Sequence, residues 1–236
     1  GKTTVIKGIL AVLEKAGCRI LLAAPTGRAA RRLADSSGHP AVTVHRLLEY
    51  TPNGGGFNFG KNGGDPLDAD AIIIDEASML DITLTYHLLK AVQGGCRLIF
   101  VGDVDQLPSV GAGSVLKDII RSQKMPVVRL ENVFRQAEIS PVVRNAHRIN
   151  RGQMPEWEPS SDFTFVEIEN EFDAAEYVAN IYARLTQQSD WQSVQVLSPM
   201  HKNPCGVQNL NHLLQQRINP PELNKSEVNT PGNVLR

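Results

Sequence analysis

The chain alternates between segments with helical periodicity and short, continuous apolar runs. In residues 3–15 the apolar positions return every three or four residues, which predicts a helix with one buried face. Residues 20–24 form a continuous apolar run that ends before Pro25, which is typical of a strand buried on both faces. The alternation continues with expected strands at 71–74, 98–101 and 127–130 and expected helices at 80–92 and 116–120. Strands interleaved with helices predict an α/β domain with a parallel sheet covered by helices.

Residues 51–68 interrupt this pattern. Glycines gather at 54–56 and 63–64, on either side of Phe57 and Phe59. Because a core element does not tolerate this density of glycine, we expect an exposed hairpin or loop inserted into the sheet domain.

A second α/β pattern follows a predicted linker at 152–161. It consists of expected strands at 163–168 and 194–197 and expected helices at 172–185 and 207–218. Two strands are fewer than a complete sheet usually has. We therefore expect a first domain at 1–151 and, at 152–236, the opening part of a second domain that is truncated at its C-terminus.

Composition narrows the class of protein. The 236 residues include 42% hydrophobic and 21% charged residues, as in an ordinary globular protein. The net charge of −1 argues against a protein that coats polyanions, so any nucleic-acid contact must come from particular positions. No apolar run approaches the roughly 18 residues of a membrane span, and we expect no membrane partner. The three cysteines are far apart and predict reduced thiols in a cytoplasmic protein.

The first four residues carry candidate phosphate chemistry. They read Gly-Lys-Thr-Thr, the second half of G-x-x-x-x-G-K-[ST], so we expect a piece of a longer polypeptide. Backbone N–H groups at the start of the following helix can face an anion, and Lys2 adds a positive charge for the outer phosphates. The Thr3 hydroxyl can bind Mg²⁺. Taken alone, this half-motif fits an ordinary helix start equally well.

Asp75 and Glu76 follow the apolar run 71–74 directly. A strand that ends in two acidic residues places them at the carboxyl edge of a parallel sheet, where ligands bind in this architecture. Asp75 would then hold Mg²⁺ through its water shell, and Glu76 would act as a general base on the attacking water. The alternative is a solvated turn with acidic charges at a helix start. The presence of both motifs in one α/β pattern favours the nucleotide site.

Five further blocks resemble one family. Residues 102–108, Gly-Asp-x-x-Gln-Leu-Pro after a strand, are similar to motif III of superfamily 1 helicases. More narrowly, four other segments resemble blocks of the RecD/TraA group: motif Ia at 24–33, the T-x-H-R-L-L block at 43–48, motif IV at 130–136, and the opening of the second motor domain at 197–211. The chain is identified on these blocks as a member of the RecD/TraA-type superfamily 1 helicases, with the resemblance extending from residue 1 to about 220.

The resemblance implies a P-loop NTPase fold with a RecA-like domain followed by the first part of a second one. It implies that Gln106 senses the γ-phosphate and that Arg135 reaches across to the transferring phosphate. With these additions, the expected nucleotide-binding residues are Gly1, Lys2, Thr3, Thr4, Asp75, Glu76, Gln106 and Arg135, of which Lys2, Glu76, Gln106 and Arg135 are catalytic, and Thr3 and Asp75 hold Mg²⁺. The expected DNA-binding residues are Pro25, Thr26, Gly27, Arg28 and His45.

Basic side chains repeat at helical spacing in two places. Arg28, Arg31 and Arg32 follow a strand end, and a second set begins at Arg144 and continues through Arg148 to Arg151. Both patterns fit either DNA contact or a solvated helix face. Phe57 and Phe59 fit either a wedge at a duplex fork, as implied by the family, or a cover over the sheet.

The implied activity is ATP-dependent translocation or unwinding, 5′-to-3′ on single-stranded DNA, in recombination or repair. ATP is the substrate, and the implied partners are single-stranded DNA and, if the parent protein belongs to a nuclease–helicase complex, its other subunits. A P-loop ATPase that remodels protein and a non-catalytic P-loop binding module remain as alternatives. We expect the 236-residue chain alone to be a weak or inactive ATPase.

Overall fold

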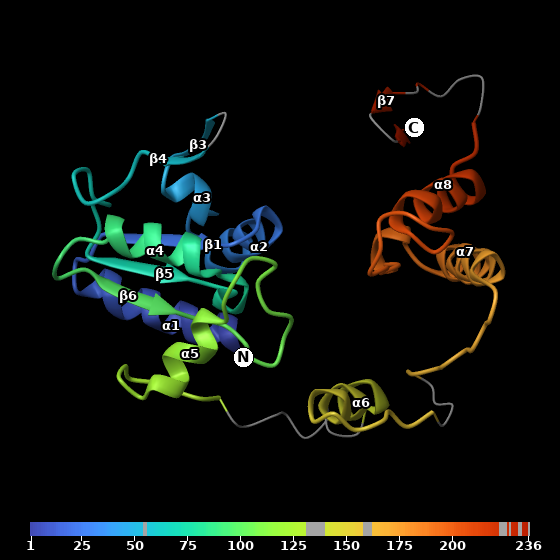
Figure 1. The fold of residues 1–236 in the computed structure, drawn as a ribbon, viewed down its shortest axis with the longest axis horizontal. Helices are drawn as coiled ribbons and strands as arrows, with labels where there is room; N and C mark the ends of the chain where they lie inside the picture. Colours follow the sequence, from blue (N-terminus) through green and yellow to red (C-terminus); the bar gives the residue numbers. More distant parts are fainter. Residues whose placement is uncertain are drawn as a thin grey trace. The chain divides into compact units, whose positions relative to one another are not determined.

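The computed structural model places the chain in two separate units. It describes residues 1–53, 56–130, 140–157, 162–221, 226, 228–230 and 233–235. The first unit is Gly1–Glu138 and the second is Ile139–Arg236, and each is described by itself (Figure 1). This division lies before residue 151, after which the sequence analysis placed the linker.

Unit 1 is built on a four-stranded parallel sheet. Its strands are arranged in the order β2 (Ala41–Thr43), β1 (Ile20–Ala24), β5 (Ala71–Ile74) and β6 (Arg97–Phe100). Every neighbouring pair is parallel, so the carboxyl ends of all four strands lie on one edge. The predicted α/β fold, a RecA-like sheet of the P-loop type, is confirmed.

The two faces of the sheet bury separate apolar clusters. Figure 1 shows α1 (Lys2–Lys15) and α4 (Ile82–Ala91) on opposite sides of the strands. Side chains alternate along a strand, so Ile72 and Ile74 of β5 pack in the cluster that includes α4, and Ile73 packs in the cluster that includes α1. β5 is buried along its whole length for this reason. It brings the next residues, Asp75 and Glu76, to the edge of a rigid core.

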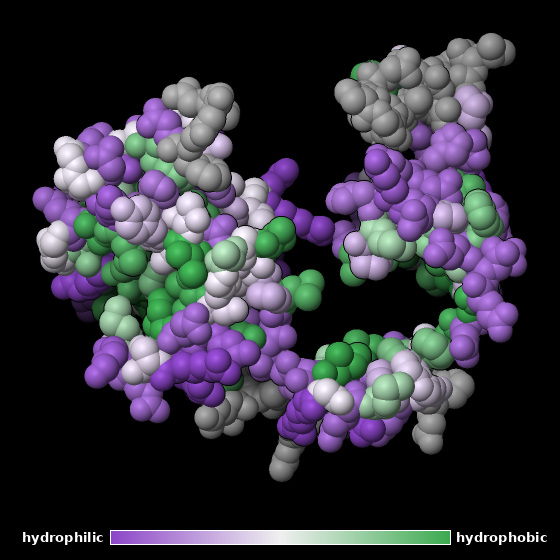
Figure 2. Space-filling view, viewed as in Figure 1, coloured by the Kyte–Doolittle hydropathy of each residue, from purple (hydrophilic) through white to green (hydrophobic). Residues whose placement is uncertain are grey.

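The outer surface of α4 is also apolar. Leu84 and Leu88 are buried on its inner face, whereas Ile82 and Leu89 are each more than half exposed. Figure 2 shows hydrophobic residues at the surface of unit 1. The helix begins at Ile82 rather than at 80 because the Asp81 carboxylate caps it, accepting a hydrogen bond of 2.7 Å from the Leu84 N–H.

Residues 50–59 form a hairpin of β3 (Tyr50–Asn53) and β4 (Gly56–Phe59), in the stretch where a hairpin or loop is expected. Phe59 is buried and stacks on the His87 ring of α4, with 4.2 Å between the ring centroids. Phe59 therefore covers the core beside the sheet, which was one of the two roles considered for it. The side chain of Phe57 lies outside the described residues.

The remaining elements of unit 1 surround the carboxyl edge of the sheet. They are α2 (Gly27–Ser37), α3 (Val44–Leu47), the short 3₁₀ helix η1 (Ala77–Met79) and α5 (Val115–Ser122).

Unit 2 is mainly helical in its described part. Its elements are α6 (Pro141–Asn150), α7 (Glu171–Gln188), η2 (Trp191–Ser193), α8 (Val207–Ile218) and the short pair β7 (Val228–Thr230) and β8 (Asn233–Leu235). α7 and α8 pack together, and Arg217 of α8 pairs with Glu176 and Asn180 of α7. Among the described residues, every helix of the chain is too short or too polar to cross a lipid bilayer.

The predictions of strands at 127–130, 163–168 and 194–197 are wrong, because these segments form no strand in the structure. Val128 and Leu197 are each 89% exposed, and Phe165 is half exposed. A strand requires a neighbour for its backbone hydrogen bonds, and none of these segments pairs with another within the described ranges. A short apolar run does not reveal whether such a neighbour exists.

Candidate functional site

The candidate residues gather at the carboxyl edge of the sheet in unit 1. β2 leads into His45, β1 into Thr26 and Arg28, β5 into Asp75 and Glu76, and β6 into the loop that carries Gln106. Since the strand order is β2-β1-β5-β6, the expected DNA-binding positions follow two adjacent strands, and three of the expected nucleotide-binding positions, Asp75, Glu76 and Gln106, follow the next two.

Lys2 and Glu76 meet at this edge. The Lys2 ammonium donates to both carboxylate oxygens of Glu76, at 3.3 Å to Oε1 and 3.1 Å to Oε2, and both side chains are partly buried. Glu76 has a left-handed backbone conformation (φ 51°, ψ 40°), which is uncommon for a residue other than glycine. This turn directs the chain from β5 into η1 and leaves the Glu76 carboxylate facing the start of α1.

The start of α1 fits an anion. Gly1 caps the helix without a side-chain hydrogen bond, and the first turn holds no acidic residue. The Thr4 N–H donates to the Gly1 carbonyl at 3.1 Å, whereas the N–H groups of Lys2 and Thr3 precede the first helical hydrogen bond. Free N–H groups and the helix dipole favour a negative charge at this place.

Asp75 lies in a partly desolvated position beside this pair. Burial raises the pKa of its carboxyl group above the usual value, and the nearby negative charge of Glu76 adds to the effect. The hydrogen bond from the Glu76 N–H to Asp75 Oδ1, at 2.9 Å, and the charges of Lys2 and Arg32 act in the opposite direction on the pKa. A carboxylate that is short of solvation is a good ligand for a cation.

Thr3 and Asp75 offer a hydroxyl oxygen and a carboxylate oxygen. These are hard oxygen ligands, and Mg²⁺ commonly takes one or two protein oxygens together with phosphate and water. The donor set at this edge therefore fits Mg²⁺ bound together with a nucleotide.

Gln106 lies in the loop after β6. Its carboxamide donates to the Asp103 carboxylate at 3.1 Å, and its own N–H donates to the Asp103 carbonyl at 3.3 Å. Within the described residues it makes no hydrogen bond to Lys2 or Glu76, so the structure brings those two together and leaves Gln106 turned to its own loop. Arg135 lies outside the described residues.

The expected DNA-binding residues after β1 begin with Pro25 and Thr26, and Thr26 caps α2. Its hydroxyl oxygen accepts a hydrogen bond of 3.3 Å from the Ala29 N–H. The hydroxyl proton remains able to donate to another group, and Gly27 and Arg28 are exposed next to it, with Pro25 half-buried.

His45 is exposed on α3, which starts where β2 ends. Its ring makes an edge contact with Tyr50 at 5.5 Å between centroids. The short helix is capped by Thr43, whose hydroxyl accepts from the Arg46 N–H at 3.1 Å. The helices that follow β2 and β1 therefore each start with a threonine cap, Thr43 or Thr26, with an exposed basic residue, His45 or Arg28, two positions later.

Two arginine sets differ in their surroundings. Arg32 is close enough to Asp75 to oppose the rise in the pKa of that carboxyl group, which places it toward the acidic pair. In unit 2, Arg144 and Arg148 pair with Glu156 at 3.0 and 3.4 Å. The second basic set is thus partly neutralised within its own unit.

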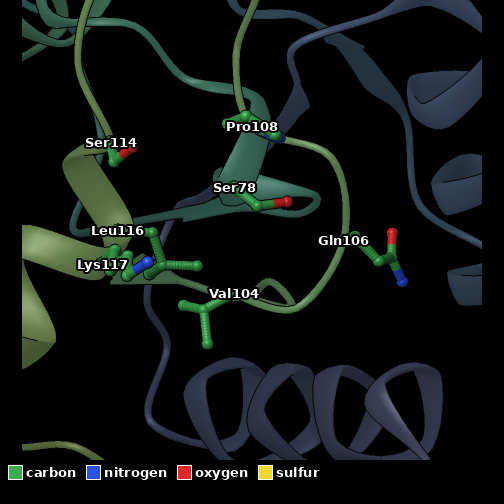
Figure 3. Close-up of a pocket in the computed structure, with 7 residues that line it drawn as sticks. All are labelled: Ser78, Val104, Gln106, Pro108, Ser114, Leu116 and Lys117. Atoms are coloured by element: carbon green, nitrogen blue, oxygen red, sulfur yellow. The ribbon is translucent and has the colours of Figure 1, made fainter. Parts of the chain in front are cut away.

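From the sequence, Arg32 is a candidate for DNA contact only, and Ser78 is not a candidate for any role. Helical spacing groups Arg32 with Arg28 and cannot show that it approaches Asp75. Ser78 follows the acidic pair by two positions and is only 9% exposed. It lines a pocket together with Gln106 (Figure 3), which depends on the path of the loop after β6.

Sequence comparisons place the chain among known proteins. The profile of the AAA domain family matches residues 1–169. The ATP-dependent RecD2 DNA helicase of Deinococcus radiodurans is 40% identical over 222 residues, which is 94% of this chain and 30% of that protein. The RecBCD enzyme subunit RecD of Mycobacterium tuberculosis is 42% identical over 143 residues, covering 51% of this chain and 24% of that protein. The chain thus resembles RecD-type helicases, as predicted, and spans less than a third of these relatives.

Among solved structures, Bacteroides Pif1 bound to ssDNA matches 76% of this chain and 50% of that chain, with 22% identity and a TM-score of 0.41. Bacteroides sp Pif1 in complex with ADP-AlF4 matches 52% of this chain and 30% of that chain, with 27% identity and a TM-score of 0.31.

Proposed function

The chain belongs to the AAA domain family, and from this premise we propose that it is the nucleotide-hydrolysing part of a RecD-type DNA helicase. The observation that carries the proposal is the contact between Lys2 and Glu76 at the carboxyl edge of the sheet, beside the desolvated Asp75. ATP hydrolysis needs a cation that binds phosphate, a carboxylate that activates water and a carboxylate that binds a metal ion.

The proposed reaction is hydrolysis of ATP to ADP and phosphate. The terminal phosphate takes the place of the Glu76 carboxylate on the Lys2 ammonium. Glu76, released from Lys2, accepts a proton from the attacking water as the water oxygen bonds to the γ-phosphorus and the bond to the bridging oxygen breaks. Thr3 and Asp75 would hold Mg²⁺, which supplies positive charge to the phosphate oxygens.

Four further residues complete the proposed site. Gln106 contacts the terminal phosphate from the loop after β6, and Arg135 stabilises the developing charge. Gly1 and Thr4 frame the start of α1, where free N–H groups favour phosphate.

Single-stranded DNA is the proposed polymer substrate. Thr26, Gly27 and Arg28 lie at the threonine-capped start of α2, which follows β1 after Pro25, and His45 lies at the threonine-capped start of α3, which follows β2. Hydroxyl, backbone and basic groups of this kind bind phosphates of a strand without reading its sequence. The proposed nucleotide site and the proposed DNA site lie on the same edge of the sheet, so a conformational change caused by ATP binding or hydrolysis would be transmitted to the bound DNA. Movement in the 5′-to-3′ direction, a role in recombination or repair, and assembly with other subunits of a nuclease–helicase complex follow from the family resemblance.

The decisive measurement is the ATPase rate of the full-length protein with and without single-stranded DNA. We expect Mg²⁺-dependent hydrolysis that DNA increases, and its loss in Glu76→Gln. Hydrolysis that ignores DNA but responds to a protein substrate would favour the protein-remodelling ATPase, and ATP binding without hydrolysis would favour the binding module. Unwinding of partial duplexes with either a 5′ or a 3′ single-stranded tail tests the polarity.

A further inference from the structure

A small pocket lies between η1 and the loop that follows β6. Its volume is about 130 Å³, and its walls include Ser78 of η1, Val104 and Gln106 of the loop, and Leu116 of α5 (Figure 3). Ser78, two positions after Glu76 in the chain, therefore lines the same pocket as Gln106. The pocket joins the two segments that the proposed reaction requires to act together.

The Ser78 hydroxyl has no protein partner in this pocket. Ser78 is 9% exposed, and its Oγ makes no hydrogen bond within the described part of the chain. In Figure 3 the hydroxyl points across the pocket toward the side of the loop that carries Gln106. A buried hydroxyl without a protein partner is uncommon in folded proteins, and it leaves Ser78 Oγ available to a group that enters the pocket in another state.

The loop is fixed at its beginning and exposed further along. The Ala77 N–H donates to the Val101 carbonyl at 2.9 Å, and Gly102 packs so closely on η1 that an added Cβ would lie 3.0 Å from the Ser78 nitrogen. Further along, Leu107 is 85% exposed and Val110 is fully exposed. Gln106 therefore lies in the exposed part of a loop whose start is attached to η1.

We propose that Ser78 is a positioning residue whose hydroxyl holds the Gln106 carboxamide when nucleotide is bound. This inference rests on the proposed function. In the structure the carboxamide donates to Asp103 instead. When a terminal phosphate draws the Gln106 NH₂ group away from Asp103, the Ser78 O–H donates to Gln106 Oε1. The amide is then oriented with its N–H groups toward the phosphate, and both groups gain a partner.

The test is hydrogen exchange of residues 103–110 in the full-length protein, with and without a non-hydrolysable ATP analogue and Mg²⁺. In the wild type we expect the analogue to slow exchange in this segment. In Ser78→Ala the factor by which the analogue slows exchange should be about tenfold smaller, the equivalent of about 1.4 kcal/mol. Ser78→Thr should restore the wild-type factor. Ser78→Ala should also keep or raise Tm, because an unpartnered hydroxyl is removed.

Thr85→Val is the matched control. Thr85 is another buried hydroxyl, 6% exposed, but it donates to the Asp81 carbonyl at 2.7 Å. Its loss should lower Tm and leave the nucleotide-dependent protection at 103–110 intact. A merely structural hydroxyl at position 78 would behave like Thr85.

Gln106→Ala combined with Ser78→Ala should lose no more protection than Gln106→Ala alone, since the Gln106 change already removes the contact that Ser78 would make. Additive losses, protection in Ser78→Ala equal to the wild type, or no protection by nucleotide in the wild type would each overturn the proposal. The DNA-stimulated ATPase rate is measured in parallel. If DNA has no effect on it while the exchange pattern is as expected, the helicase function fails and the role of Ser78 stands.

Discussion

The ammonium of Lys2 lies 3.1 Å from Glu76 Oε2, joining two residues 74 positions apart in the chain. One is the first residue of α1 and the other follows the end of β5, so the contact depends on the packing of helix against sheet. It compensates the Lys2 charge within the protein. A phosphate that binds Lys2 must compete with Glu76, and in doing so releases the carboxylate that the proposed reaction uses as base.

Glu76→Gln should therefore separate binding from chemistry. We expect ATP turnover to fall about 10²-fold or more, because the general base is lost. ATP affinity should be unchanged or higher, because Lys2 no longer has an anionic partner in the protein. Calorimetry with ATP and Mg²⁺, together with steady-state rates, measures both quantities in the full-length protein.

Lys2→Ala is the natural comparison, and it should weaken ATP binding as well as turnover. Equal turnover in the wild type and Glu76→Gln would remove Glu76 from the mechanism. An equal loss of ATP affinity in both variants would show that Glu76 does not compete with phosphate.

Asp75→Asn should raise Tm at neutral pH while weakening Mg²⁺-dependent ATP binding. Burial raises the pKa of Asp75, so its ionised form is less favourable in the folded state than in the unfolded chain. The asparagine keeps an oxygen to accept from the Glu76 N–H but carries no charge. The gain in Tm should be largest above the raised folded pKa and should vanish as pH falls to the usual range of an unfolded aspartate.

Thermal melts of both proteins from pH 3 to 8 give this comparison. A lower Tm for Asp75→Asn at pH 7 would mean that the carboxylate is stabilised by its neighbours more than it is penalised by burial.

The fold of unit 1 was accessible from the sequence, because its central strands leave a strong local signal. Ile72, Ile73 and Ile74 are apolar on both faces of β5, and two acidic residues mark its end. The segment at 163–168 has a similar apolar character, yet it is not a strand. Whether a run becomes a strand depends on a partner for its backbone, which a local pattern does not contain.

The same limit applies to the site. Lys2, Asp75 and Glu76 are recognisable because helix start and strand end are local features. The approach of Arg32 to Asp75 depends on how α2 packs beside β1, and the burial of Ser78 depends on the loop after β6. Neither arrangement leaves a periodicity in the sequence, and the expected role of Arg135 falls on residues outside the described ranges.

His39 and Glu14 should make the stability of unit 1 depend on pH. His39 Nε2 lies 2.5 Å from Glu14 Oε1, and this hydrogen bond raises the pKa of His39 above its usual value. A raised folded pKa contributes stability that is complete below the unfolded value of about 6.5 and is lost as pH rises through the folded value. Glu14→Gln should therefore lower Tm at pH 5.5 and have little effect at pH 9.

The pair is partly exposed, so we expect a small change in Tm, which added salt should reduce further. His39→Gln in the Glu14→Gln background also removes the contact of His39 Nδ1 with the Ser37 carbonyl oxygen, at 3.0 Å, so any further loss at pH 5.5 measures that contact and not the Glu14 pair. A Tm difference that does not depend on pH would assign the effect to packing rather than to the charge on His39.

Gly102→Ala should destabilise the chain where the loop after β6 meets η1. A Cβ at this position would lie 2.7 Å from Leu116 Cδ2, 3.0 Å from the Ser78 nitrogen and 3.1 Å from the Ala77 nitrogen. The leucine side chain can turn away, but the two backbone nitrogens belong to η1, where the Ala77 N–H is held by the Val101 carbonyl. Relief of the overlap must then separate the loop from η1, at a cost of about 1–3 kcal/mol.

Gly94→Ala is the control for this last change, because nothing lies within 4 Å of a Cβ added at Gly94 and its φ is not positive. We expect denaturant unfolding to show a change within about 0.5 kcal/mol for Gly94→Ala and a clear loss for Gly102→Ala. Since Gly102 directly precedes the segment that carries Gln106, the loss should extend to ATP turnover in the full-length protein. Wild-type stability of Gly102→Ala would show that the loop and η1 can move apart without cost, and that the close contact at Gly102 does not anchor the loop.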